Sequence, residues 1–125
     1  MINETFGWLW IVLGFASGGL LGLKFQRENW LGGYGSYRRR LIRLGHISFL
    51  GLGFLNILFA HSLGRIRLES SLLAIASWSL IVGAMTMPIC CGLMAWRRSL
   101  QPFFAIPVIS LLVGGGLILV GLVQP

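Results

Sequence analysis

The sequence contains no aspartate and only three glutamates, so acidic side chains are nearly absent from it. Glu4, Glu28 and Glu69 all lie outside the long apolar stretches. A chain without interior carboxylates has no paired-carboxylate site, no Ser-His-Asp triad and no carboxylate relay for protons at mid-membrane depth. We therefore expect no catalytic residue, no metal site and no enzymatic activity of its own.

Cysteine is also scarce. The only two, Cys90 and Cys91, are adjacent in the sequence. Neighbouring residues on a helix point about 100° apart, which is poor geometry for a mutual disulfide. We interpret both as small buried hydrophobic residues.

Long apolar stretches make up most of the chain, at residues 6–23, 44–63, 71–96 and 103–123. A helix of roughly 20 residues crosses the hydrocarbon layer of a membrane. Hydrophobic residues form 56% of the chain and charged residues 10%, and the continuous apolar runs do not alternate as barrel strands do. The prediction is an all-α membrane protein, a single integral membrane domain (residues 1–125) of four transmembrane helices in an antiparallel bundle. Pro88 predicts a kink in the third helix.

Positive charge is distributed unevenly between the two sides of these stretches. Eight of the ten Lys and Arg residues lie in or beside the connections 24–43 and 97–102, and only Arg65 and Arg67 fall on the other side. The positive-inside rule places both connections in the cytoplasm and both termini outside it, in the cell inner membrane. Nucleic acid is not an expected partner, because the basic residues border lipid rather than form one face of a folded domain.

The connection 24–43 has the composition of a membrane-interface segment. Aromatic residues there serve as interfacial anchors, and each nearby arginine attracts anionic lipid headgroups by about 1 kcal/mol. We predict these lipid and interface roles for Trp30, Tyr34, Tyr37, Arg38, Arg39, Arg40 and Arg43.

Small and polar residues indicate where helices pack together. Gly14, Gly18 and Gly22 recur at four-residue spacing on the first helix and predict a stripe that a second helix approaches closely. Asn56 on the second helix needs a hydrogen-bond partner, because an unsatisfied amide is costly in hydrocarbon. The candidates are a group of another subunit or one of three residues of the third helix, namely Ser77, Ser79 and Thr86.

Two histidines on the second helix are the main candidates for chemistry. His46 and His61 are 15 residues apart, which is about 22 Å along a helix and about 60° around it. This spacing resembles the b-type cytochromes of respiratory membranes, in which one helix supplies histidines to two haems at different depths. The resemblance covers this helix alone and implies haem b, with second axial ligands from Met85, Met87, Cys90 or Cys91. The alternative is that each histidine forms hydrogen bonds at its own membrane interface.

We expect a small non-catalytic subunit of a larger inner-membrane complex, favouring an energy-transducing one, that packs against partner subunits and helps to hold lipid or cofactor. The alternative is a small b-type cytochrome or haem-anchoring protein that uses His46 and His61. A small channel or carrier is disfavoured by the lack of charge at mid-membrane depth.

Overall fold

The computed structural model describes residues 2–124 and contains four long helices. They are α1 (Ile2–Phe25), α2 (Tyr37–Ser62), α3 (Ser70–Trp96) and α4 (Ala105–Val123). With the 3-10 turns that adjoin α2 and α4, all four are long and apolar enough to cross a membrane. No strand occurs within the described residues. Met1 and Pro125, which the predicted domain also includes, lie outside them.

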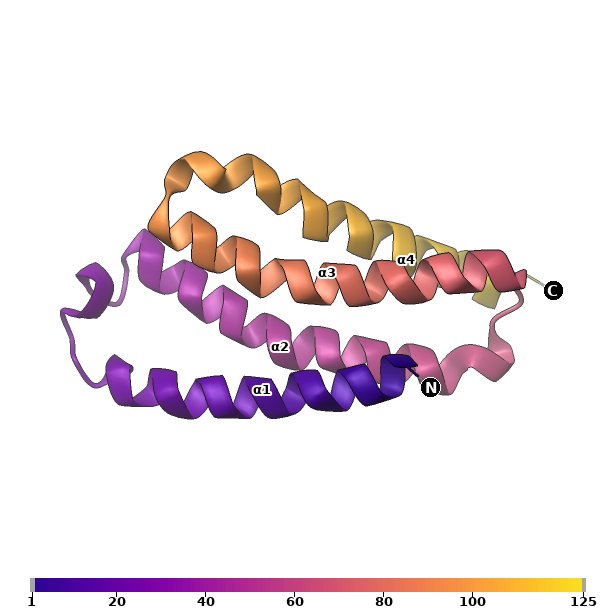
Figure 1. Cartoon of the computed structure of the whole chain (residues 1–125), viewed down its shortest axis with the longest axis horizontal. Coiled ribbons are helices and arrows are strands. Elements are labelled where there is room, and N and C mark those ends of the chain that lie inside the picture. Colours follow the sequence, from indigo (N-terminus) through magenta and orange to yellow (C-terminus); the bar gives the residue numbers. More distant parts are fainter. Residues whose placement is uncertain (1, 125) are drawn as a thin grey trace.

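The helices lie side by side in chain order (Figure 1). Extensive contacts join α1 to α2, α2 to α3 and α3 to α4, whereas α1 and α3 meet at few positions. The two ends of the described chain and the connection between α2 and α3 lie at one end of the molecule; the other two connections lie at the opposite end. The arrangement therefore leaves α1 and α4 as two flanks, each with a long face that no helix of this chain covers.

The second helix begins earlier than its apolar stretch. Ser36 is its N-cap, and the Ser36 hydroxyl accepts a hydrogen bond from the Arg39 backbone N–H at 3.2 Å. Such a cap satisfies a backbone donor that a helix start otherwise leaves unpaired. The arginines from Arg38 to Arg43 therefore belong to the first two turns of α2, not to a loop. The connection itself is shorter and contains the 3-10 turn η1 (Trp30–Gly32).

The third helix continues through its proline. α3 is one helix from Ser70 to Trp96, with Pro88 inside it. At this level α2 presents Gly45, where an added Cβ would lie 3.1 Å from Cys91 Cβ and 3.6 Å from Pro88 Cα. The proline-containing turn is thus packed closely against a glycine of α2.

α1 and α2 are in close backbone contact at two glycines, Gly7 and Gly53. A Cβ added to Gly7 would lie 2.6 Å from the Gly53 carbonyl oxygen, and one added to Gly53 would lie 2.9 Å from the Gly7 carbonyl oxygen. Only the absence of side chains lets the two backbones come this close. Gly7 lies two helical turns before Gly14, outside the predicted glycine stripe.

A buried polar cluster beside this contact connects three helices. The Asn3 side-chain amide donates to Asn56 Oδ1 at 2.8 Å and to the Ser77 carbonyl oxygen at 3.2 Å. The Ser77 hydroxyl donates to Asn3 Oδ1, and Asn56 Nδ2 donates to the Leu52 carbonyl oxygen at 2.8 Å. Asn3 and Asn56 are both 0% exposed. Asn3 of α1 therefore links Asn56 of α2 to Ser77 of α3 through hydrogen bonds. Asn3 lies just before the predicted first span.

We predict that Gly53→Ala destabilises the protein, whereas Gly51→Ala does not. The added methyl group at Gly53 would collide with the Gly7 carbonyl oxygen and Ile11, and overpacking of this kind costs about 1–3 kcal/mol. Gly51 is on the same helix, and its Cβ position has no atom within 4 Å. Thermal unfolding of the two variants in detergent measures the difference. Equal melting temperatures would contradict the close contact.

Candidate functional site

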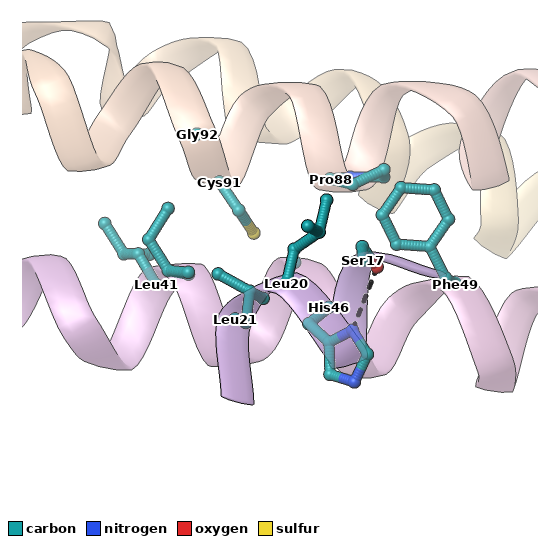
Figure 2. A pocket seen from close by; sticks show the side chains of 11 residues that line it. Ser17, Leu20, Leu21, Leu41, His46, Phe49, Pro88, Cys91 and Gly92 are labelled. Carbon is teal, nitrogen blue, oxygen red and sulfur yellow. Dashed lines mark hydrogen bonds between the residues drawn. The ribbon is translucent and has the colours of Figure 1, made fainter. Parts of the chain in front are cut away.

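An apolar groove of about 280 Å³ lies between α1, α2 and α3 (Figure 2). Most of its lining is hydrocarbon, and two polar side chains, Ser17 and His46, border it. Pockets that are largely apolar with a few converging polar groups are the usual form of a small-molecule site. The apolar wall includes Leu20, Leu41, Phe49 and Pro88.

His46 is held in one orientation by α1. Its Nδ1 lies 3.2 Å from the Ser17 hydroxyl, which also donates to the Gly14 carbonyl oxygen at 3.0 Å. Because a hydroxyl has a single proton, we assign the imidazole as the donor at Nδ1, which leaves a lone pair on Nε2. The ring lies against Gly18, where an added Cβ would be 2.8 Å from His46 Cε1. Nε2 lies on the α1 side as well, because the same added Cβ would be 3.1 Å from it.

The two cysteines have different surroundings. Both are buried free thiols. Cys91 lines the groove from α3, and Figure 2 shows its sulfur pointing into the gap, with Leu20 drawn between it and the imidazole. The Cys90 sulfur instead lies 3.5 Å from the Phe103 carbonyl oxygen. The groove therefore contains one of the two thiols.

The other predicted cofactor residues lie apart from this groove. His61 is exposed at the opposite end of α2, with its Nε2 3.8 Å from Glu4 Oε1. Met87 is half-buried on α3 and does not line the groove. Of the five candidates, the structure thus brings together only His46 and Cys91. Across residues 2–124, no group of three or more His, Cys, Asp and Glu side chains is placed to hold a metal ion.

The predicted glycine stripe divides between two environments. A Cβ added to Gly14 would meet Phe49 at 3.0 Å and Leu50 at 3.1 Å, and Gly18 receives the His46 ring. Gly22 has no atom within 4 Å of its Cβ position. Two of the three glycines therefore face α2, and the third faces outward.

Arg39 has a position that its sequence context did not indicate. It is 5% exposed, and its guanidinium donates to the Phe25 carbonyl oxygen at 3.0 Å and to the Glu28 carbonyl oxygen at 3.1 Å. Its Cζ also lies 4.9 Å from the centre of the Phe25 ring. This arginine, predicted as a lipid contact, satisfies carbonyl groups at the C-terminal end of α1 and beyond, where a cation is favoured by the helix dipole.

The remaining interface residues lie around the same end of the molecule. Arg43 lies over the Tyr34 ring at 4.2 Å and donates to the Tyr34 carbonyl oxygen, and Trp30 packs edge-on against Phe25. Arg98, beyond α3, lies over the Tyr37 ring at 4.6 Å. Arg38 and Arg40 are exposed. These contacts hold the aromatic rings and the guanidinium groups next to one another at the end of the molecule near η1.

Comparison of the chain with protein-family models, with curated proteins and with solved structures found no match.

We predict that Gly18→Ala displaces the His46 ring, whereas Gly19→Ala leaves it in place. A methyl group at Gly18 would lie 2.8 Å from the ring, and the Cβ position of Gly19 is open. Displacement breaks the bond to Ser17 and costs on the order of 1 kcal/mol. Imidazole ¹⁵N resonances report the change, and His61→Gln assigns them because the chain has two histidines. Unchanged His46 resonances in Gly18→Ala would contradict the assigned contact.

Proposed function

We propose that the protein is a small non-catalytic subunit of a larger, energy-transducing complex of the cell inner membrane. In this role it packs against helices of partner subunits and helps to hold lipid or a cofactor between them. The observation that carries the proposal is a set of glycines on the two flanking helices that face outward. No helix in residues 2–124 covers them.

The outward glycines are Gly19 and Gly22 on α1 and Gly115 and Gly116 on α4. None has an atom within 4 Å of its Cβ position. Glycine within a helix lowers the stability of the helix by roughly 0.5–1 kcal/mol relative to alanine. A glycine that faces lipid makes no contact that offsets this loss. In membranes, small residues repay this cost where a second helix packs closely against them. The inward glycines of this chain, such as Gly7 and Gly53, have such a neighbour, and we infer that the outward ones have theirs on another subunit.

The groove beside His46 supports the cofactor-holding part of the proposal. His46 Nε2 carries a lone pair in the assigned tautomer, and Cys91 borders the same space. A partner helix seated on α1 would complete the open side of the groove and supply any further ligand. The same observation favours the second candidate function, a b-type cytochrome or haem-anchoring protein, in which His46 is one axial ligand.

We further propose that the four helices form an antiparallel bundle with both termini outside the cytoplasm. One side of the apolar spans has eight of the ten Lys and Arg residues. They are Lys24, Arg27, Arg38, Arg39, Arg40, Arg43, Arg97 and Arg98. Such an excess of Lys and Arg is retained on the cytoplasmic side. The support for this orientation is the charge distribution, together with the location of the connections 26–36 and 97–104 at one end of the molecule (Figure 1).

We predict that the chain, purified gently from native membranes with an affinity tag, brings other integral-membrane subunits in fixed stoichiometry. Gly116→Leu, which adds bulk to an open outward position, is expected to reduce the recovered partners at least about tenfold, because a helix can no longer approach closely. Val113→Leu is the matched control, since it adds bulk at an exposed position of the same helix that is not a glycine. Subunit stoichiometry by quantitative mass spectrometry is the measurement.

Recovery of the chain alone, or equal recovery of partners by both variants, would contradict the packing role. An absorption spectrum of the same preparation separates the two candidate functions. A Soret band that His46→Ala abolishes supports haem ligation, and a colourless assembled complex rejects it.

We predict that alkaline phosphatase fused after residue 124 is active in cells, whereas the same enzyme fused after residue 36 is inactive. Alkaline phosphatase folds only outside the cytoplasm, where its disulfides form. Fusions after residues 67 and 100 serve as controls, with activity expected at the first and none at the second. The reverse pattern would overturn the proposed orientation.

A further inference from the structure

The groove beside His46 continues toward the end of the molecule that contains the arginines. A second cavity of about 340 Å³ shares Ile42 and Gly92 with the first. A third, of about 510 Å³, shares Leu31, Arg38, Ala95 and Trp96 with the second. The three cavities adjoin one another through these shared residues, and we call them together the α2–α3 groove. It runs between the two helices from the level of His46 to their ends near η1.

The two ends of the α2–α3 groove differ in the charged side chains that line them. The end near His46 is lined by hydrocarbon from Leu20, Leu41 and Phe49 (Figure 2). The end near η1 is lined by Arg38, Arg98 and the polar side chains of Ser36 and Tyr37. A molecule that fills the whole groove must therefore be apolar along most of its length and anionic at one end.

The cations of this end have no acidic partner within the part of the chain that the structure describes. The ion pair found in residues 2–124 joins Glu4 to His61, at the other end of the molecule. Arg38 and Arg98 come from different helices and line the same cavity. The Tyr37 ring, whose centre is 4.6 Å from Arg98 Cζ, lines this cavity as well. Guanidinium groups are the side chains that bind phosphate most readily, and two of them border this one cavity without an acidic partner in residues 2–124.

The location matches a lipid rather than a soluble anion. Trp96 borders the same cavity and is 83% exposed, as expected for an indole at the membrane interface. Beyond Trp96 the groove is lined by apolar side chains. An acyl chain can pack against them, whereas a free phosphate ion loses its hydration there. The N-terminus of α2 adds a favourable field for an anion at this level.

We propose that the α2–α3 groove binds one anionic phospholipid. Its phosphate lies between Arg38 and Arg98, and one acyl chain passes Ile42 and Gly92 into the apolar part beside His46. This extends the lipid-holding part of the proposed function to a defined site and a defined lipid class. Because the site belongs to this chain alone, it is measured on the isolated protein, and its failure leaves the subunit proposal standing.

The headgroup end is tested by lipid titration of the full chain in detergent, followed by native mass spectrometry. We expect dioleoyl-phosphatidylglycerol to form a one-to-one adduct and dioleoyl-phosphatidylcholine to bind at least about tenfold more weakly. In the double variant Arg38→Gln/Arg98→Gln, the phosphatidylglycerol affinity falls at least about tenfold. The matched control, Arg65→Gln/Arg67→Gln, removes the same charge at the other end of the chain and retains the adduct.

The acyl-chain end is tested by Gly92→Leu. Gly92 lines both the first and the second cavity, and its Cβ position has no atom within 4 Å, so leucine fills the groove without disturbing the packing. Its control is Gly51→Leu, another open position, on α2 and outside the lining of these cavities. We expect loss of the phosphatidylglycerol adduct in Gly92→Leu and retention in Gly51→Leu. Circular dichroism establishes that each variant is folded.

Three results would overturn the proposal. Equal loss of affinity in the two double-arginine variants would mean attraction by net charge alone. Retention of the adduct in Gly92→Leu would mean that no acyl chain enters the groove. Competition by inorganic phosphate at the concentration of the lipid would assign the arginines to a soluble anion.

Discussion

The contact between Gly7 and Gly53, together with the hydrogen bonds of Asn3, is the interaction on which the rest of the structure depends. In lipid, apolar side chains gain little by leaving one hydrocarbon environment for another, so helices associate through close packing and hydrogen bonds. The two glycines bring the backbones of α1 and α2 together, and Asn3 joins both helices to α3 at the same level. With this end joined, α1 lies along α2 and places Ser17 beside His46.

Glycine has two separate roles in this chain. Gly7, Gly53 and Gly45 allow a neighbouring helix of the same chain to approach. A Cβ added to Gly19 or Gly116 would meet no described atom within 4 Å, and we infer that these glycines pack against a helix of another subunit. The arginines divide similarly. Arg39 is buried and satisfies carbonyl groups of its own chain, whereas Arg38 and Arg98 border an open groove without an acidic partner.

The sequence predicted the number and type of the membrane-spanning elements, because apolar stretches of this length have one stable form in lipid. The site was less predictable. Asn56 needs a hydrogen-bond partner, and the sequence predicts one on α3 or on another subunit. Its partner in the structure is Asn3 of α1, which lies before the apolar run that predicts the first span. Arg39 is indistinguishable from its basic neighbours in composition, and only the folded chain places its guanidinium against the Phe25 and Glu28 carbonyl oxygens, where it is buried. His46 and His61 share one helix, yet only His46 borders the groove.

The sequence by itself determined that the chain is helical, apolar enough to cross a membrane four times and almost free of acidic groups. These properties follow from composition and from the length of each stretch, which act locally. Only the tertiary structure decided which glycines face inward, which histidine has a serine beside it and which arginines line a common groove. Those outcomes depend on the rotation of each helix about its axis, and that rotation is set by contacts between residues far apart in the chain, such as Asn3 and Ser77.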